Sequence, residues 1–196
     1  SFGEPTITID VTLPRETDEG PVTIAYTDVK VRRLEDYLVS LDGIEAIQTA
    51  VGGGGQDGLV GSSTISENEA TLTLSVESQE KLDELTLKVR AKSEEIFGGS
   101  DYVTVSSASL SEQGFAGFAV VISGNEDNPP TLAELAQYDP LVISTLEQIE
   151  GVTNVESTLE RIALTDGDVG QTYIRIDGIP AVRYSAELET KDTLGL

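Results

Sequence analysis

Apolar and polar residues alternate near the start of the chain, as they do in a strand with one buried face. Ile7, Ile9, Val11 and Leu13 are separated by threonine and aspartate, and Pro14 ends the run. The pattern predicts a strand whose apolar side chains enter a core.

The next apolar residues recur at helical spacing. Val31, Leu34, Leu38 and Leu41 are three or four residues apart, which places them on one face of a helix that Gly43 ends. Further strands are predicted over residues 44–51, 70–76 and 102–105.

A second helix is predicted between the last two of these strands. Ser78 can cap its start. Four apolar residues form its buried face and two glycines stop it: Leu82, Leu85, Val89, Ile96, Gly98 and Gly99. Residues 1–112 therefore read βαββαβ, a ferredoxin-like split βαβ unit with two helices on one face of a sheet.

A second unit is predicted from a strand at residues 118–122. Thr131 followed by Glu134 is a capping-box pattern, and Pro140 breaks or kinks the helix that it opens. Gly151 ends this helix before a strand at 152–159. Residues 173–176 and 181–188 form a predicted hairpin around Asp177-Gly178.

The two units share one junction between helix and strand. Residues 41–49, Leu-Asp-Gly-Ile-Glu-Ala-Ile-Gln-Thr, match residues 149–157, Ile-Glu-Gly-Val-Thr-Asn-Val-Glu-Ser, at a constant offset. The match indicates a duplication, although chance similarity at such a junction also explains it. The predicted fold is α+β, with two ferredoxin-like subdomains at 1–112 and 113–196, the second incomplete.

Charge and composition narrow the possible partners. The 35 acidic and 12 basic residues give a net charge of −23, which opposes binding to nucleic acid or to an anionic membrane. No apolar run reaches the roughly 18–20 residues that cross a bilayer. The sequence begins at Ser1 and has no Met, so we expect a processed protein or a fragment, with any membrane-spanning segments outside it.

Catalytic chemistry finds little support in the residue types present. The chain has no His and no Cys, which removes the usual zinc ligands and the common nucleophile–base pairs. Acidic pairs such as Glu94 and Glu95, or Asp166 and Asp168, fall where solvated helix surfaces and turns are expected. We therefore expect no enzyme activity, no metal and no cofactor.

A glycine-rich run separates two predicted strands. It reads Val51-Gly52-Gly53-Gly54-Gly55-Gln56-Asp57-Gly58-Leu59-Val60 and continues through a further glycine to Ser63. No Lys-Ser or Lys-Thr pair follows it and it opens no helix, so a phosphate cradle is weakly supported. A mobile loop between two strands is the direct interpretation, either a plain connection or a gate.

Several motifs together resemble the second large extracytoplasmic loop of the resistance-nodulation-division transporters, in their drug and metal efflux branch. In chain order they are Ile9-Asp-Val-Thr-Leu-Pro, the Leu41 motif leading into the glycines, Gly114-Phe115-Ala-Gly-Phe118, Gly151-Val-Thr-Asn-Val-Glu-Ser and Arg175-Ile-Asp-Gly-Ile-Pro-Ala-Val. Each motif is loose, but their order and spacing cover nearly the whole chain.

The resemblance implies two porter subdomains that flank a substrate cleft. The run from Val51 to Ser63 corresponds to the switch loop, and Phe115 and Phe118 correspond to an aromatic pair lining the entrance. It further implies small amphiphilic or hydrophobic substrates, an extracytoplasmic location, membrane attachment only through flanking segments, and a homotrimer.

The sequence departs from this family in two places. Among the residues of the glycine-rich run, only Leu59 and Val60 are bulky, whereas well-known drug pumps carry aromatic residues there. Only residues 161–174 stand where the family inserts a docking region.

Two other classes of function remain open at this stage. One is an envelope protein-interaction or assembly module with the same duplicated sheet, and a missing ligand-sized cleft would favour it. The other is a carboxylate-based hydrolase, which needs two acids that converge in one pocket.

Overall fold

The first half of the chain folds as the predicted βαββαβ unit in a computed structural model, which describes residues 5–52, 66–108, 117–125, 127–159, 162–163, 169–170 and 173–189. A small β2–β3 hairpin interrupts its first connection. In chain order its elements are β1 (Thr6–Thr12), β2 (Glu16–Thr17), β3 (Gly20–Pro21), α1 (Ile24–Val39), β4 (Ile44–Val51), β5 (Glu69–Val76), α2 (Gln79–Phe97) and β6 (Val103–Ala108).

The second half contains two short helices and six strands. They are β7 (Gly117–Ser123), α3 (Leu132–Ala136), α4 (Asp139–Glu147), β8 (Val152–Ser157), β9 (Ile162–Ala163), β10 (Val169–Gly170), β11 (Tyr173–Ile176) and β12 (Ile179–Leu188). The predicted strand at 118–122 and the hairpin around Asp177-Gly178 are both confirmed.

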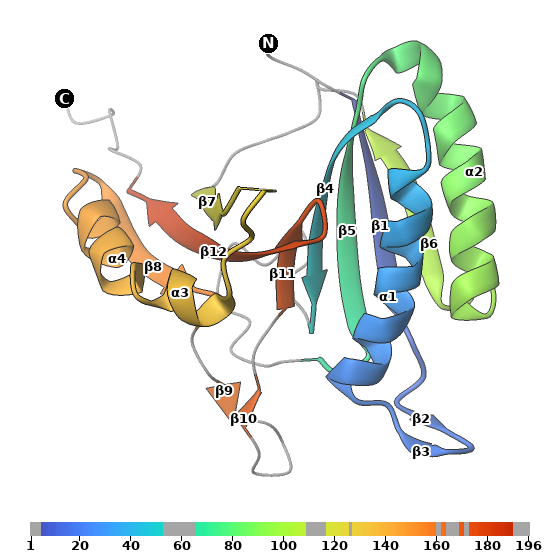
Figure 1. Ribbon diagram of the computed structural model, residues 1–196, viewed down its shortest axis with the longest axis horizontal. Helices are drawn as coiled ribbons and strands as arrows, with labels where there is room; N and C mark the ends of the chain where they lie inside the picture. The colour runs from blue at the N-terminus through green and yellow to red at the C-terminus, as the bar shows by residue number, and fades with distance from the viewer. Residues whose placement is uncertain are drawn as a thin grey trace, which may run out of the picture.

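One antiparallel sheet runs through both halves. Its order is β6-β1-β5-β4-β11-β12-β7, and β8 pairs with β12 beside this path. Helices α1 and α2 lie side by side on one face of strands β6, β1, β5 and β4, and α3 and α4 lie at the other end of the molecule (Figure 1). The predicted α+β class is confirmed.

The larger core lies between strands β6, β1, β5 and β4 and the helices α1 and α2. Ile7 and Ile9 of β1 are fully buried, and so are Leu34 and Leu38 of α1. Ile9 faces Leu72 of β5 in the sheet register. Full burial of one such side chain contributes about 1.5–3 kcal/mol. The alternation in β1 and the helical spacing in α1 place their apolar side chains in this same core.

The ends of the helices differ in detail from the sequence predictions. α1 ends at Val39, before Gly43, which lies in the following turn with φ of +99°. Ser78 does occupy the cap position of α2 in an extended conformation, but its side chain makes no capping hydrogen bond. Gly98 ends α2 in the left-handed conformation, as predicted.

The second half repeats the helix of the first half. At the offset that relates the two sequence junctions, Thr131 corresponds to Thr23, and each threonine is an N-cap whose side chain accepts a hydrogen bond from a backbone amide of the first turn. The capping box between Thr131 and Glu134 is confirmed. α3 and α4 together span Leu132 to Glu147, which corresponds to α1 at the same offset, and Pro140 marks the break between them.

The turn after the helix is repeated as well. Gly43 and Gly151 both have positive φ, +99° and +86°. The carbonyl of Gly43 accepts from the Glu77 amide at 2.8 Å, and that of Gly151 accepts from the Glu189 amide at 2.7 Å. The unit β7-α3-α4-β8-β12 thus has the arrangement of β1-α1-β4-β5, which supports duplication over chance similarity.

A polar cluster occupies the core of the second half. The Tyr184 hydroxyl donates to Asp139 Oδ1 at 2.7 Å, and the Ser157 hydroxyl donates to the same oxygen at 2.8 Å. Tyr184 is 1% exposed and packs with Leu135 and Leu146. Burial first, and then the hydrogen bond and charge of Asp139, raise the pKa of Tyr184 well above its usual value.

This raised pKa predicts a loss of stability in alkali. The folded state favours neutral Tyr184, so its contribution is complete below the unfolded pKa of about 10 and is lost as the pH rises above that value. Urea unfolding at a series of pH values should show the decline. Tyr184→Phe should flatten it, whereas Tyr26→Phe, at a site 38% exposed, should not. An equal decline in the Tyr184→Phe protein would contradict the assignment.

Candidate functional site

Strand β11 joins the two halves of the protein. Its residues Tyr173 to Ile176 pair with Val51 to Gln48 of β4, and its other edge pairs with β12. β4 would otherwise be the edge of the first sheet. The hairpin from the second half therefore completes the sheet of the first half beside α1 (Figure 1).

Arg175 is the central charged residue of this junction. It lies opposite Thr49 of β4 in the sheet register and is 3% exposed. Its Nε donates to Glu35 Oε1 and Oε2 at 2.9 and 3.1 Å, and its guanidinium also contacts Glu35 Oε1 through Nη2. Nη1 donates to Asp28 Oδ1 at 2.5 Å. One guanidinium from β11 thus holds two carboxylates from α1.

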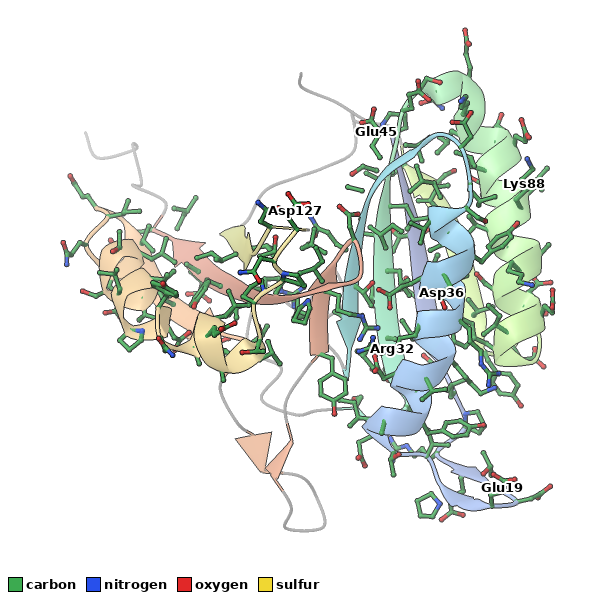
Figure 2. The ribbon with its side chains drawn as sticks, viewed as in Figure 1. Glu19, Arg32, Asp36, Glu45, Lys88 and Asp127 are labelled. Carbon is green, nitrogen blue, oxygen red and sulfur yellow. The ribbon has the colours of Figure 1, made fainter. Side chains whose placement is uncertain are left out.

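A second arginine completes the cluster. Arg32 Nε donates to Asp28 Oδ2 at 2.9 Å, so two positive charges balance two negative ones. Figure 2 shows Arg32 on the side of α1 toward β4. Burial alone would lower the pKa of Arg175, but the hydrogen bonds and charges of Glu35 and Asp28 outweigh it and raise the pKa. We name Asp28, Arg32, Glu35 and Arg175 the junction cluster.

The described residues on either side of the glycine-rich run are held by hydrogen bonds. Gly52 has φ of +101°, its amide donates to Glu69 O at 2.9 Å, and its carbonyl accepts from the Ser66 amide at 2.9 Å. The hydroxyl of Thr27 donates to Glu67 O at 2.6 Å. Since Thr27 precedes Asp28, Glu67, which follows the run in the sequence, is tied to the turn of α1 that binds Arg175.

The predicted gating residues are only partly described by the structure. Val51 is fully buried in the larger core, and Gly52 lies at the base of the run. Phe118 belongs to β7, where its backbone pairs with Ala186, but its side chain lies outside the description. The other predicted residues also lie outside the described residues: Gly53, Gly54, Gly55, Gln56, Asp57, Gly58, Leu59, Val60 and Phe115.

The junction cluster was not among the residues predicted from sequence, although the sequence contained two signals for it. Asp28 and Glu35 are two helical turns apart, so they share the helix face that carries Val31 and Leu38. Arg175 alternates with Ile174 and Ile176 in a strand and so takes the opposite side of it. The sequence does not show that Arg175 binds Asp28 and Glu35, because β11 and α1 are far apart along the chain.

The turn of the β11–β12 hairpin is fixed onto β4 by Asp177. Its Oδ1 accepts from the Ile47 amide at 2.8 Å, and its own amide donates to Ile47 O at 2.9 Å. Its φ is +50°, a conformation that asparagine and aspartate tolerate better than most residues. Both features favour Asp or Asn at this position.

Substitution of Asp177 by alanine should therefore destabilise the junction. We expect a loss of about 1–3 kcal/mol, because the Ile47 amide loses its acceptor and the backbone keeps a positive φ. Asp177→Asn should lose much less, because its amide oxygen can accept the same bond. Urea unfolding of the three proteins tests this, and equal losses for the two variants would show that the hydrogen bond contributes little.

The described residues include no candidate metal centre and no candidate membrane-spanning helix. Within these ranges, no group of three or more acidic side chains is placed to hold a metal ion. No helix among them combines the length and apolar character needed to span a bilayer.

Comparison with known proteins gives a likeness at the level of structure. Neither a protein-family model nor a curated protein sequence matches the chain. Solved structures that it matches include a crystal structure of a heavy metal efflux pump, with 10% identity and a TM-score of 0.36. That match covers 96% of this chain and 27% of the pump, so the chain spans about a quarter of the pump's length.

Proposed function

We propose that this chain is an extracytoplasmic porter-like domain of a resistance-nodulation-division efflux transporter. In this proposal residues 1–112 and 113–196 are two subdomains that bind and pass small amphiphilic or hydrophobic molecules. The domain makes and breaks no bonds. Transmembrane segments outside this sequence couple it to a proton gradient, and the transporter works as a homotrimer.

The position of the glycine-rich run carries the proposal. The run leaves the sheet at Gly52, the residue after β4, and β4 is the strand that binds the hairpin of the second half. A glycine-rich segment at the junction of two sheet-based halves is well placed to control passage between them. The order of the sequence motifs supports the same assignment independently of the fold.

The junction cluster gives this gate a fixed frame. Arg175 holds β11 against α1, and Thr27 binds Glu67, which follows the run in the sequence, to the same helix. The described residues that flank the run, Gly52 and Glu67, are therefore bonded to regular elements, which in this proposal keep the sheet intact while the gate works. Apolar residues in the run, Leu59 and Val60, would contact an amphiphile by burial instead of by directed hydrogen bonds.

Transport by the full-length gene product tests the proposal. The gene would be expressed in a host that lacks its own efflux pumps, and loss of preloaded Nile red would be followed by fluorescence. We expect efflux that a protonophore abolishes. Replacing Leu59 and Val60 by serine should slow efflux severalfold with little change in the protein level.

A matched control separates gating from general damage. Leu87→Ser changes a side chain on α2 that is 64% exposed and distant from the run in sequence, so efflux should stay at the wild-type rate. A full-length protein without membrane-spanning segments would contradict the proposal, and so would Nile red efflux that the protonophore does not affect. The first result would favour an envelope assembly module, and the second would point to a transporter that is not driven by protons.

A further inference from the structure

The sheet of the first half has two sides on which it can be extended. On one side β4 pairs with β11 of the second half. On the other side lies β6, next to α2, which pairs with β1 and has no second partner strand among the described residues (Figure 1). Because an edge strand presents backbone groups to which another strand can bind, the outer groups of β6 decide whether the sheet can grow on this side.

The register of β6 with β1 shows which of its backbone groups point outward. The Thr12 amide donates to Tyr102 O at 2.9 Å, immediately beside the register pair Val11–Val103. In an antiparallel ladder the pair next to such a bond exchanges no hydrogen bonds, and the pattern alternates along the strand. Every second residue of β6 therefore turns its amide and carbonyl away from β1. These residues are Val103, Val105 and Ser107.

The composition of β6 favours pairing with a further strand. Its sequence, Val-Thr-Val-Ser-Ser-Ala, contains no charged residue and no proline, and valine and threonine are common in strands. Val103 and Val105 are each 7% exposed, so the core holds the strand in place. Charged side chains and proline are the usual means of preventing edge pairing, so any protection of this edge has to come from outside β6.

Arg90 of α2 supplies such protection. Its Nη2 donates to Val105 O at 3.1 Å, so it occupies the acceptor in the middle of the outer edge. Three other basic residues of α2 instead pair with carboxylates close to them in the sequence: Lys81, Lys88 and Lys92. Arg90 forms no ion pair with a described residue, although Glu94 follows it by one helical turn. Its guanidinium is thus directed to the strand edge.

We propose that Arg90 blocks antiparallel pairing of β6 with β6 of a second copy of this chain. In that pairing the two Val105 residues face each other and Val103 faces Ser107, so the outward groups of both strands meet. A second β6 fits this edge because both strands are uncharged, whereas the chain as a whole has a net charge of −23 that keeps copies apart elsewhere. The inference does not depend on a role in efflux, because it concerns only self-association.

Arg90→Ala tests the proposal, with Lys88→Ala as its matched control. Both changes remove one positive charge from α2, but Lys88 binds Glu84 instead of β6. Sedimentation velocity would compare both variants with the wild type up to millimolar concentration in about 1 M NaCl, where a Debye length of about 3 Å limits the repulsion between copies. We expect Arg90→Ala to form dimers with a dissociation constant at least about tenfold below that of the other two proteins.

A second change locates the contact. Ser107→Pro removes an outward amide of β6 without removing a bond to β1, since proline has no N–H. Added to Arg90→Ala, it should restore the monomer. In Arg90→Ala alone, the outward amides of Val103, Val105 and Ser107 should exchange with solvent more slowly as the protein concentration rises.

Two outcomes would overturn the proposal. If Arg90→Ala stays monomeric over the range in which the wild type does, Arg90 does not block self-association. If Arg90→Ala associates and Ser107→Pro leaves that association unchanged, the contact lies away from β6. The second outcome includes association through unfolded chains, which the loss of one outward amide would not reverse.

Discussion

Replacing Arg175 by methionine is expected to lower the free energy of unfolding by about 3–5 kcal/mol, the usual cost of removing one partner from a buried ion pair. Glu35 and Asp28 would keep their positions on α1, but Glu35 would lose the partner that its two oxygens share. Arg32 would still hold Asp28, so Glu35 dominates the loss. Urea unfolding at neutral pH measures the effect.

A second variant separates charge from packing. Glu35→Met on the Arg175→Met background removes the stranded carboxylate, so the double variant should be more stable than the single one. Lys88→Met breaks an exposed pair with Glu84 on the outer side of α2 and should leave the unfolding midpoint nearly unchanged (Figure 2). If Arg175→Met unfolds at the wild-type midpoint, the junction cluster does not hold the two halves together.

Truncating Leu34 to alanine is expected to destabilise the first half by about 2–5 kcal/mol, because the loss of buried methyl groups leaves a cavity that close-packed neighbours fill only in part. Leu34 is fully buried between α1 and the sheet. The midpoint in urea should fall while the slope of the transition stays the same, since the folded state keeps its overall surface.

Leu87→Ala is the matched control for this cavity. It makes the same chemical change on the neighbouring helix, at a side chain that is 64% exposed, and should stay within about 0.5 kcal/mol of wild type. Because alanine is a better helix former than leucine, helix propensity would not explain a loss, and a similar loss for both variants would show that the burial of Leu34 is not its cause.

The sequence by itself determined the local elements and the fold class. Period-two alternation in β1 and three-to-four spacing in α1 depend only on neighbouring residues, and burial confirmed both. The capping box at Thr131, the break at Pro140 and the turn at Asp177-Gly178 are equally local. The repeated junction at 41–49 and 149–157 also held in three dimensions, because the same short pattern of apolar, acidic and glycine positions suits the same turn.

Only the tertiary structure decided how the two halves meet. The pairing of β11 with β4 joins segments that are distant in the sequence, and strand alternation states which side a residue takes but not which strand it joins. Arg175 therefore gave no sign of its partners Asp28 and Glu35 until β11 was placed beside α1. Local periodicity determines which side chains each segment buries. The choice of partner strand or helix depends on long-range packing, and the junction of β11 with β4 and α1 is such a choice.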